Sequence, residues 1–252
     1  MVFYRKYRPQ TIEELDSEDV KKTLQSILTT GSIPHAFLFT GPKGLGKTST
    51  ARIVAKYVNC QGKEEKNVKP CNQCESCLSI TNGTNLDVLE IDGASNRGID
   101  EMRDLREKIR LLPVSANKKV YIIDEVHMLT TEAFNALLKT LEEPPLHAMF
   151  ILCTTEPHKV PATILSRCFH IQFKKATTPD LVHAFERIIK AENVEAEPEA
   201  LIRIASFADG SFRDGVKVLE EIVLSAKGKK VTSVMLESLY HTNSIDIDVK
   251  NM

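Results

Sequence analysis

Short apolar runs alternate with longer amphipathic segments over most of the chain. Apolar runs of four or five residues are typical of buried strands, and apolar residues that recur every three or four positions are typical of helices. The apolar runs predict strands at Ala36–Phe39, Val88–Ile91, Val120–Ile123, Met149–Cys153 and Phe169–Phe173. Because helical patterns separate these strands, we expect an α/β fold with one parallel five-stranded sheet, covered by helices on both faces.

The helical patterns divide the chain into two domains. The first set is predicted at Val20–Leu28, 48–58, Glu101–Arg110 and Ala133–Leu141, between the strands. After Pro179 the pattern is helical only, with helices predicted at Asp180–Ala191, Pro198–Phe207 and Arg213–Lys227 and a fourth beginning near Thr232. We therefore predict an α/β domain over residues 1–177 and a small helical domain over residues 178–243.

Composition narrows the class of protein. Hydrophobic residues make up 42% of the chain and charged residues 27%, as in ordinary globular proteins. No apolar stretch approaches the roughly 20 residues of a membrane span, and the charged N-terminus does not resemble a secretory signal, so we expect no membrane partner and a cytoplasmic location. A net charge of −1 argues against a protein coated in basic charge for DNA, which leaves only a local or shared contact surface.

One segment predicts a site for a nucleoside triphosphate. It fits the pattern G-x-x-x-x-G-K-[ST], between a predicted strand and a predicted helix, and comprises Gly41, Pro42, Lys43, Gly44, Leu45, Gly46, Lys47 and Thr48, followed by Ser49. Glycines let backbone N–H groups point at phosphate oxygens, and the helix N-terminus adds its positive dipole end. Lys47 is expected to reach the β- and γ-phosphates of ATP, and Thr48 to bind Mg²⁺. The alternative is a glycine-rich turn that binds nothing, which both flanking elements disfavour.

A second apolar strand, Tyr121–Ile123, ends in two carboxylates. Ligands of parallel sheets bind at the carboxyl ends of strands, so Asp124 and Glu125 are expected beside the glycine-rich loop. Asp124 would hold Mg²⁺ with Thr48, and Glu125 would act as the base that polarises the attacking water. Two solvated acids at a strand end are the alternative.

Four cysteines predict a structural metal site. Cys60, Cys71, Cys74 and Cys77 follow the spacing C-x10-C-x2-C-x2-C, in an insertion at about residues 60–80. Four converging thiolates are typical of a closed zinc site; an iron–sulfur cluster or free thiols are the alternatives. Cys153 and Cys168 stand alone and are expected to be packing residues, as are His127 and His147.

These features resemble the AAA+ ATPases, and more narrowly the gamma and tau type of clamp-loader subunits of bacterial DNA polymerase III. The resemblance extends over nearly the whole chain and is carried by Tyr7–Thr11, the glycine-rich loop, the four cysteines, Ile123–Leu129, Phe134–Pro145 and Ile164–Cys168. It implies an AAA+ ATPase domain followed by a helical lid. It also implies a motor subunit that binds and hydrolyses ATP to load a sliding clamp onto primed DNA.

The resemblance also implies roles for individual residues. Thr155 is similar to the sensor 1 residue that orients the attacking water, and Arg213 to the sensor 2 arginine of the lid. Arg167 is similar to the arginine finger, which is supplied to ATP bound by a neighbouring subunit. Contacts to the adenine are implied for Tyr7, Arg8 and Pro9, although the adjacent segment 15–18 is one residue shorter than in most family members. Without the resemblance, a turn cap and surface ion pairs would explain Thr155 and the two arginines.

The implied partners are the delta and delta-prime subunits, further gamma or tau copies, the sliding clamp and primer–template DNA. Arg97, Arg103 and Arg106 are candidates for phosphate contacts, or they form a solvated helix face. Residues 244–252 are expected to begin a C-terminal collar that the chain lacks, as in a fragment or a shortened form. A non-hydrolysing clamp-loader subunit, or another AAA+ machine such as a helicase loader or Holliday-junction motor, is the alternative function.

Overall fold

The computed structural model describes residues 2–236, apart from 63–68, 97, 227 and 229. The chain divides into two compact units. One is the segment Pro9–Lys174, and the other joins the residues before Pro9 to those after Lys174. Among the described residues, no helix is both long and apolar enough to cross a membrane.

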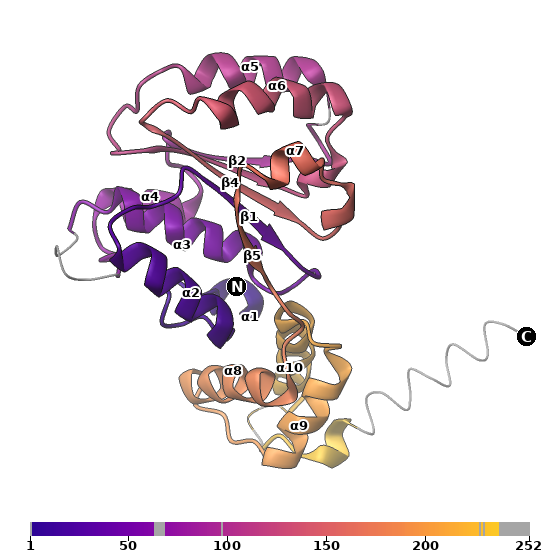
Figure 1. Ribbon diagram of the computed structural model, residues 1–252. Helices are drawn as coiled ribbons and strands as arrows, with labels where there is room; N and C mark the ends of the chain where they lie inside the picture. Colours follow the sequence, from indigo (N-terminus) through magenta and orange to yellow (C-terminus); the bar gives the residue numbers. More distant parts are fainter. Residues whose placement is uncertain (1, 63–68, 97, 227, 229, 237–252) are drawn as a thin grey trace, which may run out of the picture. The chain divides into compact units, whose positions relative to one another are not determined.

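A sheet of five parallel strands forms the centre of the larger unit, in the order β2-β3-β4-β1-β5. Strands β2, β4, β1 and β5 are labelled in Figure 1. The strands are β1 Ala36–Thr40, β2 Val88–Asp92, β3 Lys119–Asp124, β4 Ala148–Thr154 and β5 Phe169–Gln172. All five predicted strands are confirmed, and their ends lie within one residue of the prediction. The register pairs Thr40 with Thr154 and Asp92 with Asp124, so the carboxyl ends of these strands meet at one edge.

Helices cover both faces of the sheet, with α5 and α6 on one face and α2, α3 and α4 on the other (Figure 1). The helices of this unit are α2 Glu18–Thr29, α3 Lys47–Asn59, α4 Glu75–Asn82, α5 Ile99–Ile109, α6 Thr131–Glu142 and α7 Ala162–Leu165, with 3-10 turns at Val126–Met128 and Pro157–Lys159. Leu38, Tyr121 and Phe150 pack in the core beneath α5 and α6. The adjacent strand residues Phe37 and Ile122 are also fully buried, which explains why the strands are continuous apolar runs.

Capping residues set the helix boundaries that the apolar pattern missed. Helix α6 begins two residues earlier than predicted, because the Thr130 side chain accepts a hydrogen bond from the backbone N–H of Ala133. Helix α4 was not predicted, because its short, cysteine-containing sequence has no clear helical period. Its start is fixed by Cys74, whose sulfur accepts from the N–H of Cys77.

The smaller unit is helical, with its own apolar core. It contains α1 Phe3–Lys6, α8 Thr178–Ala191, α9 Pro198–Phe207 and α10 Phe212–Ala226. Thr177 and Asp180 form a reciprocal capping box at the start of α8. Residues 233–236 are helical, and the rest of the predicted fourth helix, like residues 244–252, lies outside the described residues.

The N-terminal residues depart from the predicted domain 1–177, because those before Pro9 belong to the helical unit. Phe3 is buried in the core of that unit, and its backbone N–H donates to Glu220 at 3.0 Å. Tyr7 donates its hydroxyl to Glu192 at 2.6 Å. The burial of Phe3 and these two hydrogen bonds therefore hold the N-terminal residues in the helical unit, although they are adjacent in sequence to the sheet domain.

Asp87 fixes the segment that leads into β3. Its carboxylate is buried and accepts the backbone N–H groups of Val114, Ser115 and Ala116 at 2.8–3.0 Å. Burial raises the pKa of the Asp87 carboxyl, but the three donors outweigh burial, and the pKa lies below its usual value. Asp87 therefore stabilises the folded chain in its ionised form.

Asp87→Asn is expected to lower the free energy of unfolding by about 1–3 kcal/mol at neutral pH, because charge-assisted hydrogen bonds are lost. The folded-state pKa lies below the unfolded value of about 3.9, so this difference is fully present above about pH 5 and shrinks as the pH falls through the folded pKa. Denaturant unfolding at several pH values measures it. Glu107→Gln, at an exposed position on α5, is the control and should change little.

Candidate functional site

The loop after β1 follows a path that favours glycine. The φ angles of Gly41, Gly44 and Gly46 are +139°, +78° and +85°. A Cβ on Gly41 would lie 2.1 Å from the carbonyl oxygen of Phe173, whose N–H donates to Thr40 at 2.7 Å. A Cβ on Gly46 would meet nothing within 4 Å. The backbone therefore packs closely against Phe173, directly after β5, and is open at Gly46.

Positive charge gathers inside this loop. Helix α3 begins directly after Gly46, and the N–H groups and positive dipole end of a helix N-terminus favour an anion there. The Lys47 side chain is buried, and its Nζ donates to the carbonyl oxygens of Gly41 and Pro42 at 2.7 and 2.8 Å. Together these groups suit a polyphosphate.

Two oxygen ligands lie next to the loop. The Thr48 hydroxyl donates to Asp124 Oδ2 at 2.7 Å, and Asp124 Oδ1 accepts the N–H of Glu125 at 3.0 Å. Asp124 is also fixed through its backbone, because its carbonyl accepts the N–H of Gly93 at 2.7 Å. A hydroxyl and a carboxylate within bonding distance of each other fit Mg²⁺, which prefers oxygen ligands and binds few protein groups.

Glu125 is held in an uncommon backbone conformation, with a φ of +46°. Its Oε2 accepts the hydroxyl of Thr155 at 2.9 Å and the N–H of Thr155 at 3.3 Å. Non-glycine residues in this region cost energy and cluster at functional sites. The fold thus places Glu125, directly after β3, next to Thr155, directly after β4. These two residues were predicted from separate segments of the sequence.

His127 makes contacts that sequence reasoning missed. Its Nδ1 lies 3.0 Å from Thr154 Oγ1 and 3.4 Å from Glu125 Oε2, and its Nε2 lies 3.1 Å from Glu156 Oε1. The hydrogen bond from Lys159 is the main reason that the pKa of Glu156 lies below its usual value. His127 thus lies between two carboxylates. In the sequence, only its position two residues after Glu125 indicated that His127 could lie near that carboxylate.

Arg167 lies at the opposite edge of the sheet from the glycine-rich loop. It lies two residues before β5, in the turn after α7, and Phe169 of β5 pairs with Phe37, near the start of β1. At about 3.3 Å per strand residue, the start of β5 is roughly 13 Å along the sheet from the glycine-rich loop. The Arg167 guanidinium forms an ion pair with Glu142 at the end of α6 and donates to the carbonyl of Thr163 at 2.6 Å.

The remaining predicted residues are distributed over both units. Arg213 is exposed in the first turn of α10, and Tyr7 and Arg8 precede Pro9 in the helical unit. Arg103 is exposed and pairs with Asp100 at 3.3 Å. Arg97 and the side chain of Arg106 lie outside the described residues.

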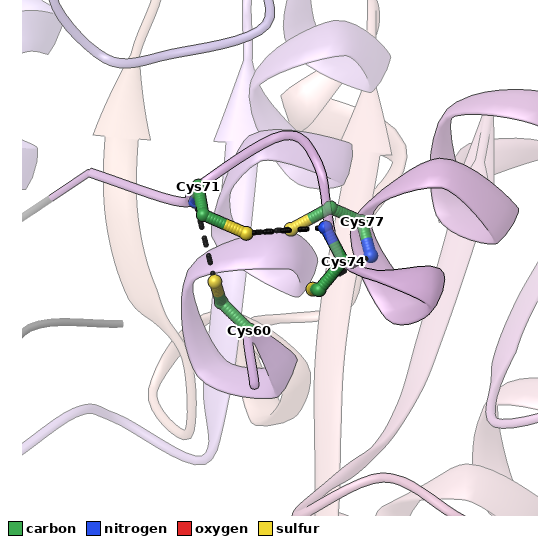
Figure 2. A group of neighbouring side chains, drawn as sticks. All are labelled: Cys60, Cys71, Cys74 and Cys77. Carbon is green, nitrogen blue, oxygen red and sulfur yellow. Dashed lines mark hydrogen bonds between the residues drawn. The ribbon is translucent and has the colours of Figure 1, made fainter. Parts of the chain in front are cut away.

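The four cysteines of the insertion converge. Their sulfurs lie within 4.8 Å of one another, with Cys60 directly after α3 and Cys77 in α4. Figure 2 shows the four side chains grouped together. Tetrahedral thiolates at a Zn–S distance of about 2.3 Å are about 3.8 Å apart. The Sγ atoms of Cys71 and Cys77 are 4.0 Å apart, which is close to that separation.

Backbone donors surround the cluster. The N–H of Cys71 donates to Cys60 Sγ at 3.2 Å, and the N–H of Cys74 donates to Cys71 Sγ at 3.3 Å. The N–H groups of Gln73 and Cys74 lower the pKa of the Cys71 thiol to about 6. These donors stabilise thiolates, so the donor set fits a tetrahedral metal ion. Burial raises the pKa of Cys153 and of Cys168, which fits their predicted packing role.

Comparisons with known proteins identify the family. Residues 16–177 match the family model described as "DNA polymerase III, delta subunit". Residues 180–227 match "DNA polymerase III clamp loader subunit, ATPase lid domain". The chain belongs to the DNA polymerase III clamp-loader family. The predicted resemblance is therefore confirmed.

Relatives of this family match along most of the chain. The tau subunit of Bacillus subtilis DNA polymerase III is 51% identical over 221 residues, which cover 87% of this chain and 39% of that protein. The gamma subunit from Buchnera aphidicola subsp. Baizongia pistaciae is 37% identical and matches 100% of this chain and 70% of its own length. The chain thus spans about two fifths of the Bacillus relative.

A solved structure supports the AAA+ fold. The RuvB Holliday-junction branch-migration motor of Thermotoga maritima has a TM-score of 0.69, covering 94% of this chain and 72% of RuvB. Its sequence identity of 19% shows a shared fold only. The identities to polymerase III subunits are higher, which favours the clamp-loader family over a Holliday-junction motor.

Metal analysis of the purified chain is expected to find about one zinc ion per chain, because four thiolates complete a tetrahedral site. Cys74→Ser should lose most of this zinc, whereas Cys168→Ser should retain it and serves as the control. Elemental analysis with an optical spectrum measures both. A brown protein that contains iron would contradict the zinc assignment.

Proposed function

We propose that this chain is an ATP-binding and ATP-hydrolysing motor subunit of the DNA polymerase III clamp loader, which loads the sliding clamp onto primed DNA. The observation that carries the proposal is the hydrogen bond between Thr48 and Asp124. It joins the glycine-rich loop to the strand end that carries Glu125, so phosphate-binding, metal-binding and basic groups lie together.

Binding of ATP is the first part of the proposal. The loop N–H groups and the N-terminus of α3 would receive the phosphates, and the Lys47 ammonium would exchange its carbonyl partners for phosphate oxygens. Thr48 and Asp124 would hold Mg²⁺, which neutralises charge on the phosphates. Tyr7, Arg8 and Pro9 are proposed to contact the adenine.

Hydrolysis is the second part. Glu125 would accept a proton from the attacking water, and Thr155 would orient that water. The hydrogen bonds from Thr155 to Glu125 support a shared task, because they hold the carboxylate at the edge where strands β1, β3 and β4 end. Arg213 is proposed to contact the γ-phosphate from the lid.

Arg167 is proposed to act on ATP bound by a neighbouring subunit. Its position before the start of β5 supports this, because the loop of its own chain lies at the other end of the strands, roughly 13 Å along the sheet, beyond the reach of one side chain. A guanidinium stabilises negative charge on the transferring phosphoryl group. The motor would therefore need neighbours: delta, delta-prime and further gamma or tau copies, together with the clamp and primer–template DNA.

The four cysteines are proposed to hold structural zinc in the cytoplasm, where cysteines stay reduced. A non-hydrolysing clamp-loader subunit is disfavoured, because Lys47, Thr48, Asp124 and Glu125 are all present. No other function has a specific observation in its favour.

Glu125→Gln tests the hydrolytic role. The variant should bind ATP as wild type does, because no phosphate or metal ligand is lost, while turnover should fall roughly 10²–10⁴-fold. Turnover is measured alone and with the other subunits, clamp and primed DNA; wild type should be stimulated most when all are present. Glu132→Gln, at an exposed position on α6, is the matched control. Undiminished turnover in Glu125→Gln would refute the assignment of the base.

Arg167→Ala tests the shared site. The nucleotide affinity of the isolated chain should not change, while the ATPase rate of the assembled loader should fall on the order of 10³-fold. Glu142→Gln removes the local ion pair but keeps the arginine, so its assembled rate should stay near wild type. Equal loss in both variants would indicate a structural ion pair instead of a finger.

A further inference from the structure

Lys56 is a buried cation next to the cysteine cluster. It lies on α3, one helical turn before Cys60, and is 1% exposed. Its Nζ donates to the side-chain oxygens of Gln10 and of Asn72, the latter at 3.1 Å. Within the described part of the chain, Lys56 forms no ion pair with a carboxylate. Amide oxygens alone compensate poorly for burying a charge.

The thiolates supply the missing negative charge. Four thiolates around one Zn²⁺ leave about two negative charges, and Cys60 and Cys77 are themselves buried. Burial lowers the pKa of Lys56, and Cys77 foremost, with Glu14, opposes that shift by charge. A metal-loaded cluster would therefore offset the buried charge of Lys56.

Asn72 connects Lys56 to the turn that carries the ligands. It lies between Cys71 and Cys74 with a φ of +56°, a conformation that asparagine tolerates but does not prefer. Its side-chain oxygen is held by Lys56. Fixing the Asn72 side chain thus fixes the turn between the ligands Cys71 and Cys74.

The Lys56 ammonium also contacts Gln10, which lies at the start of the larger unit. Gln10 Oε1 also lies 3.4 Å from the Thr81 hydroxyl on α4, which donates its hydrogen to the carbonyl of Cys77 at 2.8 Å. Gln10 thus accepts from Lys56 on α3 and lies next to α4. Lys56 is the common partner of Gln10 and Asn72.

We propose that Lys56 is a positioning residue of the metal centre: it balances the charge of the metal-bound thiolates and, through Asn72, holds the ligand turn in place. This proposal rests on the zinc site proposed above. It assigns the buried lysine to the metal and not to ATP.

The rate at which zinc leaves the purified chain in excess chelator tests the role of Lys56. Lys56→Met keeps most of the side-chain volume and removes the charge, so we expect zinc release about 10–100-fold faster than in wild type, as for other partners of metal ligands. A chromogenic zinc indicator follows the release. Lys119→Met is the matched control: Lys119 is also buried, and its Nζ donates to the carbonyl of Lys108 at 3.3 Å. It should release zinc as wild type does.

Thermal unfolding separates this role from simple packing. Without metal, Lys56→Met should unfold at the same temperature as wild type or higher, because a buried charge has been removed. The increase in Tm on adding zinc should be smaller in the variant. A packing role would lower the Tm of both forms equally and leave that increase unchanged, which would overturn the proposal.

Asn72→Gly gives an independent test if Lys56→Met does not fold. Glycine adopts the same φ readily, so the turn persists while the oxygen held by Lys56 is lost. Release should again be faster than in wild type, and an unchanged rate would overturn the proposal. If zinc-loaded wild type and Lys56→Met release zinc equally, only the role of Lys56 fails. If wild type takes up no zinc, the zinc site fails with it.

Discussion

The hydrogen bond from the Thr48 hydroxyl to the Asp124 carboxylate joins the two halves of the candidate site. Thr48 is placed by the loop after β1 and Asp124 by the end of β3, with β4 between these strands. The parallel register brings both ends to one edge, and the loop and Asp124 become neighbours there. Every other group of the site, from Lys47 to Thr155, takes its place from this alignment.

The parts of the fold that follow a local rule could be predicted from the sequence. The strands are continuous apolar runs because both faces of the sheet are buried. The glycine-rich loop follows the spacing G-x-x-x-x-G-K-[ST], which is typical of phosphate-binding loops. The cysteine spacing predicted a cluster, which the four converging sulfurs support. The carboxyl-edge rule placed Asp124 and Glu125 near the loop, as the structure has them.

Long-range contacts could not be predicted in this way. Phe3 joins the helical unit through apolar burial and a bond to Glu220, which no local pattern encodes. The bridge of His127 between Glu125 and Glu156 depends on a turn after β3 that sequence periodicity does not describe. Lys56 has the spacing of an ordinary helix residue, and only the folded insertion reveals its partners.

The contact between Gly41 and Phe173 has a mechanical consequence. The carbonyl of Phe173 occupies the space where any side chain on Gly41 would lie, and its N–H is bonded to Thr40. Phe173 is followed by Lys174, the last residue of the sheet unit before the chain enters the helical one. A shift of the loop at Gly41 is therefore expected to displace Phe173, and with it the residues where the chain passes from one unit to the other. The conformation of the glycine-rich loop is thus coupled to the position of that crossing point by direct backbone contact.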